Sequence, residues 1–148
     1  MIVARHRQGP FRLQLPLCLK LAAELLIAAE EFAAAEALLR EADQLVNATR
    51  QMWIKSELCR VYAVLAERHA DGHGFDPEHW LNTSLAQARQ QHDRYAELCA
   101  ARDLGRLYVR RGEREKAHDL LAKVCRGFIG GSDSPDVQQA KALLDTLA

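Results

Sequence analysis

The sequence is poor in glycine, proline and aromatic residues. In 148 residues, glycine occurs 8 times and proline 4 times, and Phe, Trp and Tyr together make up 6%. A β-sandwich would need more valine, isoleucine, threonine and aromatic residues than this. Alanine and leucine, which both favour helices, instead occupy 24 and 22 positions. The composition therefore favours an all-α protein.

The chain also lacks an excess of charge of either sign. It contains 20 basic and 20 acidic residues, so its formal net charge is zero. Without a net field, neither nucleic acid nor an anionic membrane would attract the chain. The hydrophobic content of 49% is high enough to bury a core, which excludes a disordered chain. We expect one compact domain that binds neither nucleic acid nor membranes.

Long apolar runs and paired cysteines are missing as well. No stretch reaches the roughly 18 apolar residues that span a bilayer, and the first ten residues carry charges where a signal peptide needs an apolar run. The cysteines at positions 18, 59, 99 and 125 lie far apart among apolar neighbours. This pattern favours buried free thiols in a reducing cytoplasm over a disulfide or a metal site.

Apolar residues at spacings of three and four predict seven helices joined by short turns. The expected helices cover about residues 13–29, 31–48, 52–68, 77–91, 94–111, 114–126 and 135–147. Asp76-Pro77 and Ser134-Pro135 are typical helix starts, with a capping residue followed by proline in the first turn. Residues 1–12 form a lead-in before the first helix.

A pattern of small and large residues repeats in the helix pairs. Its clearest example is Leu104-Gly105-x-x-Tyr108, followed by Ala117 and Leu121. A small residue where two helices cross lets their backbones approach, and a large residue fills the adjacent gap. We therefore expect Gly105 to mark a close helix crossing.

This spacing resembles that of the tetratricopeptide repeat (TPR), a helix–turn–helix unit of 34 residues. Ala23 and Cys59 take the position of Gly105 in two earlier units. The middle unit fits with about six residues inserted in its turn, where Pro77 replaces the usual alanine. The resemblance implies an α-solenoid of three TPR-like hairpins, at about residues 16–51, 52–97 and 98–131, with a capping helix over 134–148.

A narrower resemblance is carried by three segments. Residues 19–26, 96–108 and especially 134–145 are similar to the C-terminal TPR segment of large bacterial regulators. Those proteins join a P-loop ATPase to an adenylate cyclase-like or DNA-binding output domain. The resemblance implies a sensor or scaffold region in signalling or transcription regulation. The chain itself has no G-x-x-x-x-G-K-[ST] loop, so a fragment and a short stand-alone relative both remain open.

The TPR resemblance also implies a binding site. In TPR proteins the first helix of each pair lines a concave groove through fixed repeat positions. These positions correspond to Lys20, Glu24, Trp53, Glu57, Arg60, Arg102, Asp103, Arg106 and Arg110.

Arg102, Arg106 and Arg110 of this set recur every fourth residue and form one stripe, which suits a peptide carboxylate. The alternative is a solvated face partly neutralised by Asp103 and Glu113. For Trp53 and Trp80 the alternative is packing, which we favour because the domain has few other large side chains.

Histidines gather near one predicted loop. His69 and His73 have the spacing of a metal pair on a helix, with His79 close by. Glycines at 72 and 74 interrupt that helix, so loop composition explains the cluster better than a metal site. The Gly130-Gly131-Ser132 turn likewise needs no phosphate.

Catalytic motifs are not found in the sequence. No serine or cysteine lies in a Gly-framed nucleophile turn, and His118 beside Asp119 is expected to face solvent. We therefore predict a protein that is not an enzyme and uses no cofactor or metal. The predicted function is recognition of a protein or peptide. The alternatives are a homo-oligomerisation module, with exposed repeat ends forming a homodimer, and a domain that senses a small ligand.

Overall fold

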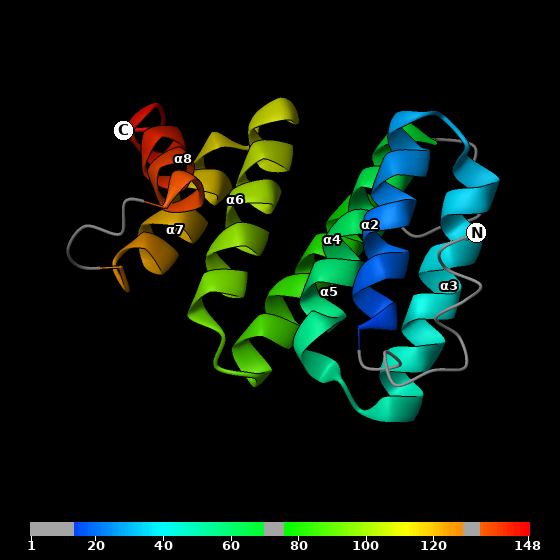
Figure 1. Ribbon diagram of the computed structural model, residues 1–148. Helices are drawn as coiled ribbons and strands as arrows, with labels where there is room; N and C mark the ends of the chain where they lie inside the picture. Colours follow the sequence, from blue (N-terminus) through cyan, green and yellow to red (C-terminus); the bar gives the residue numbers. More distant parts are fainter. Residues whose placement is uncertain (1–13, 70–75, 129–133) are drawn as a thin grey trace. The chain divides into compact units, whose positions relative to one another are not determined.

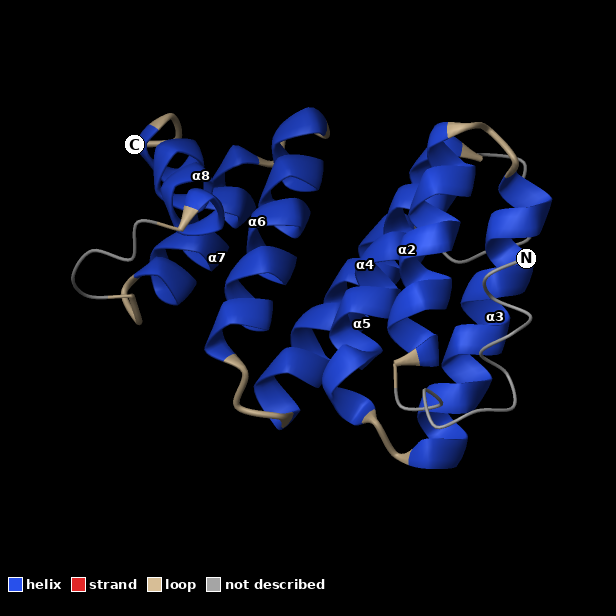
Figure 2. Cartoon of the chain, in the orientation of Figure 1, coloured by secondary structure: helices blue, strands red, loops and turns tan. Residues whose placement is uncertain are grey.

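The computed structural model describes residues 14–69, 76–128 and 134–148, and in these ranges it contains helices and no strand (Figure 1, Figure 2). The elements are α2 (Leu15–Ala28), α3 (Phe32–Thr49), the 3-10 turn η2 (Met52–Ile54), α4 (Lys55–Arg68), α5 (Pro77–Gln90), α6 (Arg94–Arg110), α7 (Arg114–Cys125) and α8 (Pro135–Asp145). The predicted all-α class is confirmed, and the described helices lie close to their predicted bounds.

Two compact units make up the chain, Met1–Trp80 and Leu81–Ala148, with the boundary inside α5. The lead-in over residues 1–12 and the histidine loop around residue 73 lie outside the described residues. The stacking of all helices into one solenoid over residues 13–148 stays a prediction.

In the first unit, α2 and α3 form a closely packed hairpin, and α4 packs against both (Figure 1). Each helix contributes one apolar stripe at the three- and four-residue spacing of a buried helix face. The buried core comprises Leu15, Leu19, Ala23, Ile27, Ala35, Leu39, Ala42, Val46, Ile54, Leu58, Val61 and Leu65. Burial of each leucine contributes about 2 kcal/mol, so this stripe pattern holds the three helices together.

In the second unit, α6 and α7 form a hairpin, and α8 packs against both. The two helices lie close together at Gly105, where a Cβ atom would lie 3.0 Å from Leu121 Cδ1. A larger residue at this point would have to displace the Leu121 side chain. The sequence predicted this close crossing, and it is confirmed for this helix pair. Val137 and Ala140 form the buried side of α8.

Left-handed residues occur in four of the described turns. Glu30, Arg50, His92 and Gly112 have φ between 54° and 79°. A left-handed residue stops a helix and turns the chain sharply, but only Gly112 is a glycine, which takes this conformation without strain. The predicted helix bounds place a turn at all four positions, but Glu30, Arg50 and His92 carry no side-chain signal for a left-handed conformation.

Two helix starts differ from the prediction. Residues 52–54 were expected to begin a helix but form the 3-10 turn η2, because left-handed Arg50 ends α3 and the chain reverses tightly. Ser134 precedes α8 but makes no capping hydrogen bond with its side chain. A side-chain cap that the sequence did not predict is found at α6, where Asp93 accepts a 2.9 Å hydrogen bond from the Ala96 amide.

The four cysteines are free thiols in different environments. Cys59 and Cys99 are buried as predicted, and Cys125 is half-buried. The prediction is wrong for Cys18, which is exposed because it lies on the outer side of α2, next to buried Leu19. None of the described helices is long and apolar enough to cross a bilayer.

Candidate partner-binding site

Four of the predicted groove residues form one charged network in the first unit. Lys20 Nζ lies 3.1 Å from Glu24 Oε1 on α2 and 3.5 Å from Glu57 Oε2 on α4. Arg60 Nη1 donates a 2.8 Å hydrogen bond to Glu57 Oε1. The network therefore joins the two helices and places the predicted side chains of both on one surface.

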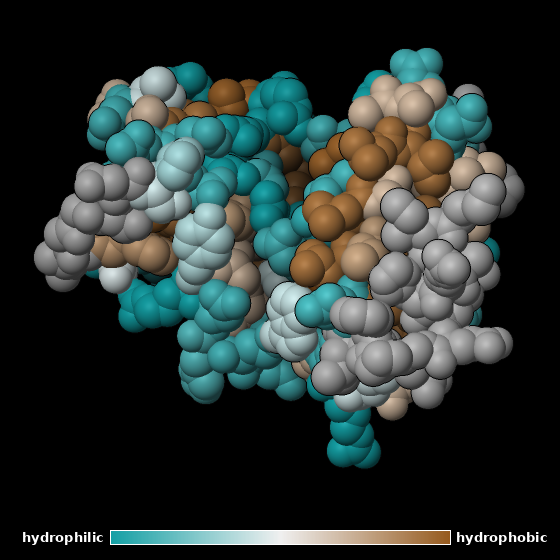
Figure 3. Space-filling view, in the orientation of Figure 1, coloured by the Kyte–Doolittle hydropathy of each residue, from teal (hydrophilic) through white to brown (hydrophobic). Residues whose placement is uncertain are grey.

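Apolar side chains surround this network. Trp53 is 56% exposed and lies one helical turn before Glu57, and Val64, also exposed, lies one turn after Arg60. Leu17 and Leu21 are exposed one turn before Lys20 and Glu24. In Figure 3, hydrophobic surface covers the outer part of α2 beside hydrophilic surface.

We call this surface the α2–α4 face. It comprises Leu17, Lys20, Leu21, Glu24, Trp53, Glu57, Arg60 and Val64. The packing role favoured for Trp53 is wrong, because the short η2 turn holds this side chain outside the core. Leu17, Leu21 and Val64 were missed, although they occupy repeat positions of the kind that the TPR resemblance assigns to the groove. Apolar character alone does not show whether such a residue is buried or exposed.

Two of the three arginines in the stripe, Arg102 and Arg106, form hydrogen bonds to side chains of α8. Arg102 is 5% exposed and donates from Nε to Asp103 at 3.0 Å and from Nη1 to Asp136 of α8. Arg106 Nη2 donates a 2.9 Å hydrogen bond to Gln139 Oε1 of the same helix. The solvated-face alternative is therefore wrong for Arg102, whose guanidinium is bound inside the unit.

The other two predicted groove residues of α6, Arg110 and Asp103, are more exposed than Arg102. Arg110 is exposed at the end of α6. Asp103 is half-buried and lies 3.8 Å from Arg106 Nη1. Whether these side chains contact a partner stays a prediction.

The remaining aromatic and histidine candidates pack inside the first unit. Trp80 stacks on Tyr62 with ring centroids 4.3 Å apart, which confirms its packing role. His79 meets the edge of the Trp80 ring at 5.8 Å, and His69 stacks on Phe32 at 4.8 Å. His73 lies outside the described residues. Among the side chains that are described, no three His, Cys, Asp or Glu residues come together to hold a metal ion.

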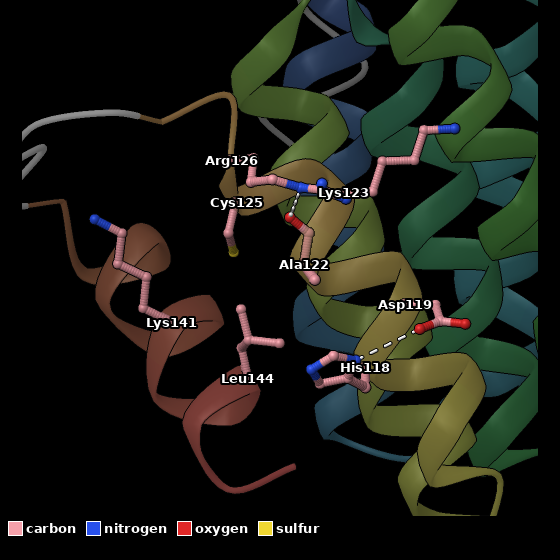
Figure 4. Close-up of a pocket in the computed structure, with 8 residues that line it drawn as sticks. All are labelled: His118, Asp119, Ala122, Lys123, Cys125, Arg126, Lys141 and Leu144. Carbon is pink, nitrogen blue, oxygen red and sulfur yellow. Dashed lines mark hydrogen bonds and ion pairs between the residues drawn. The ribbon is translucent and has the colours of Figure 1, made fainter. Parts of the chain in front are cut away.

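An open hollow lies between α7 and α8 in the second unit (Figure 4). His118, Cys125, Lys141 and Leu144 contribute to its lining. Burial raises the pKa of the Cys125 thiol, which keeps it protonated and therefore a weak nucleophile. His118 Nδ1 lies 3.5 Å from Asp119 Oδ1, and both side chains are exposed, as expected for His118. The hollow therefore holds no activated cysteine.

Comparisons of the chain with models of known families, with curated proteins and with solved structures found no significant match. The TPR relationship thus stays a prediction from residue spacing.

Proposed function

We propose that this chain is a non-catalytic protein-interaction domain of TPR-like helix pairs, which binds a peptide segment of a partner protein on the α2–α4 face. The observation that carries the proposal is the gathering of predicted groove residues on one surface. They are Lys20, Glu24, Trp53, Glu57 and Arg60.

The physical character of this face suits such a ligand. An exposed tryptophan is the side chain that most often dominates binding energy at protein interfaces, because it buries a large area with few rotatable bonds. The two cations and two carboxylates neutralise each other, so they attract a complementary charged pair more than a ligand of one sign. The peptide is therefore expected to carry apolar anchors flanked by charges of both signs.

The wider setting that we propose is a regulatory module of a larger bacterial signalling or transcription-regulating ATPase, acting in the cytoplasm. The resemblance of residues 19–26, 96–108 and 134–145 to the C-terminal TPR segment of such regulators supports this setting. In it, partner binding on the α2–α4 face would be the input signal, and the chain itself would carry out no chemistry.

Selection from a displayed peptide library against the whole chain tests the proposal. Enriched peptides are expected to shift the amide NMR signals of α2 and α4. Trp53→Ala should weaken their binding at least tenfold, because the main apolar anchor point is lost. Tyr95→Ala is the matched control, since Tyr95 is a similarly exposed aromatic residue in the other unit. Enriched peptides that shift other amides and bind Trp53→Ala normally would overturn the proposal.

The same peptides test the predicted extension of the site to α6. If Arg106 and Arg110 also contact the partner, Arg106→Glu with Arg110→Glu should abolish capture. Unchanged capture would confine the site to the first unit and remove the two arginines from it.

A further inference from the structure

A hollow of about 330 Å³ lies in the second unit, between α7 and the turn that joins α5 to α6. We call it the α5–α7 hollow. It is lined by Arg89, His92, Arg94, Glu97, Lys123 and Val124. Two arginines and a lysine bring three positive charges to it, and Glu97 is the single carboxylate among the described residues that line it. The hollow is therefore cationic, although the chain as a whole carries no net charge.

Two of these cations have no carboxylate partner. Arg89 Nε donates a 2.7 Å hydrogen bond to Glu97 Oε1, so these two charges neutralise each other. The neighbouring Asp93 caps α6 by accepting from the Ala96 amide. In the part of the chain that the structure describes, no ion pair joins Arg94 or Lys123 to an acidic side chain. Figure 4 shows that the Lys123 side chain extends away from α8.

The guanidinium of Arg94 is placed by the absence of a side chain at position 127. Gly127 follows the last turn of α7, and a Cβ atom added to it would lie 1.7 Å from Arg94 Nη2 and 2.9 Å from Arg94 Cζ. The guanidinium therefore occupies the space in which a larger residue would begin its side chain. Gly127 is not in the left-handed region, so it is the close approach of Arg94 that calls for glycine here.

This arrangement gathers positive charge at an electrostatic cost. Arg94 is the first residue of α6, where the positive end of the helix dipole disfavours a cation. Lys123 lines the same hollow and adds a like charge. The last carbonyl groups of α7 offset part of this cost for Arg94, because the end of a helix attracts a cation. A bound anion would offset the remainder for both residues.

We propose that the α5–α7 hollow binds the phosphate group of a small phosphorylated molecule. A phosphate monoester carries nearly two negative charges at neutral pH and three acceptor oxygens. A guanidinium donates two parallel hydrogen bonds to such a group, and an ammonium adds a point charge. Arg94 and Lys123 together therefore suit a phosphate better than a singly charged carboxylate.

The size and lining of the hollow define the rest of the ligand. A volume of about 330 Å³ is at the lower end of the range for small-molecule sites. Val124 is the single apolar residue among the described lining residues, so the ligand is expected to be small and polar. The site belongs to a different unit from the α2–α4 face, so this proposal goes beyond peptide binding, and either can fail without the other.

Titration of the whole chain with glycerol 3-phosphate, followed by amide NMR at constant ionic strength, tests the proposal. We expect shifts at the α5–α6 turn and at the end of α7, and much weaker shifts with acetate. Lys123→Ala should raise the dissociation constant at least fivefold. Lys116→Ala is the matched control, because it removes the same charge from an exposed position of α7 outside the hollow.

Gly127→Ala tests the placement of Arg94 without a change of charge. The added methyl group displaces the guanidinium, so the dissociation constant should rise at least fivefold, as it should for Arg94→Gln. In the Arg94→Gln background, Gly127→Ala should have no further effect on binding. A purely structural role of Arg94 at the end of α7 would instead change the melting temperature and leave phosphate binding unaltered.

Three results would overturn the proposal. The first is acetate shifting the same amides as strongly as glycerol 3-phosphate does. The second is a folded Gly127→Ala or Lys123→Ala chain that binds glycerol 3-phosphate normally, with circular dichroism as the check on folding. The third is a phosphoserine peptide that binds at least tenfold more tightly than glycerol 3-phosphate, which would replace the small molecule by a phosphorylated protein.

Discussion

Arg102 of α6 and Asp136 of α8, 34 residues apart in the sequence, form an ion pair that ties the last helix to the second unit. Arg102 is buried, and Asp136 also accepts a hydrogen bond from the Tyr95 hydroxyl. This hydrogen bond raises the pKa of Tyr95. Asp136 stands in the first turn of α8, where a carboxylate is also favoured by the helix dipole.

Removal of this carboxylate should destabilise the second unit. Asp136→Ala leaves the buried Arg102 guanidinium without the α8 carboxylate, and we expect a loss of about 2–3 kcal/mol in the free energy of unfolding. Urea unfolding measures the loss, and hydrogen exchange should rise most in α8. Asp119→Ala, at a largely exposed carboxylate of α7, should change stability by less than about 0.5 kcal/mol. Equal effects of the two variants would show that the ion pair does not hold α8.

The close helix crossing at Gly105 limits the size of the side chain that this position can hold. Gly105→Val places methyl groups against Leu121, whose side chain already lies 3.0 Å from an added Cβ. We expect a loss of about 2 kcal/mol from overpacking. Adding Leu121→Ala should cost less in the Gly105→Val background than in the wild type, because it makes room. Additive losses in this double-mutant cycle would contradict the crossing.

The left-handed conformations of His92 and Gly112 predict that substitutions at these two positions change stability in opposite directions. His92→Gly should stabilise the chain by about 0.5–1 kcal/mol, because His92 has φ 55° and glycine takes this conformation without strain. Gly112→Ala should destabilise by about 1 kcal/mol, since φ is 79° there and the space around it is open. Thermal melting monitored by circular dichroism compares the two. The same sign for both changes would contradict the backbone explanation.

The cysteines should differ in reactivity. At pH 8 an alkylating reagent is expected to modify exposed Cys18 quickly and Cys59 only when the chain unfolds. Burial raises the pKa of the Cys59 thiol from 9.0 to about 11, so its thiolate is scarce and covered. Mass spectrometry of timed samples gives the order, and modification of Cys59 first would disagree with its burial.

The raised pKa of Cys59 also predicts a pH dependence. The folded chain keeps this proton more tightly than the unfolded chain, so the stabilisation is complete below pH 9. It is lost as the pH rises from 9 through about 11, by about 2–3 kcal/mol in total. Subtracting the curve of Cys59→Ala isolates this contribution from those of tyrosines and lysines. If the free energy of unfolding of the wild type and of Cys59→Ala changed equally with pH, the predicted contribution of Cys59 would be contradicted.

Much of the secondary structure was predictable from residue spacing. Helix periodicity is a local property, and the stripe from Ala35 to Val46 or from Leu58 to Leu65 can be recognised without knowing what it packs against. The exceptions are local conformations that no side chain signals. Arg50 and His92 are left-handed at the points where the chain leaves one helix for the next, and neither residue type signals this.

The candidate site was only partly predictable. Repeat spacing placed Lys20 and Glu57 on neighbouring helices, and their ion pair joins those helices in the structure. The same spacing did not distinguish exposed Leu21 from a core leucine, because hydrophobicity does not tell which side of a helix is covered. Nor did it show that Arg102 would be buried.

The sequence by itself determined where the chain is helical and that two helices lie close together at Gly105. These are consequences of side-chain size and polarity at fixed helical spacing. Only the tertiary structure decided that Arg102 pairs with Asp136 and that Trp53 and the outer leucines of α2 stay exposed. Those outcomes depend on which helix comes to lie beside which, and this is set by the summed packing of residues far apart in the chain.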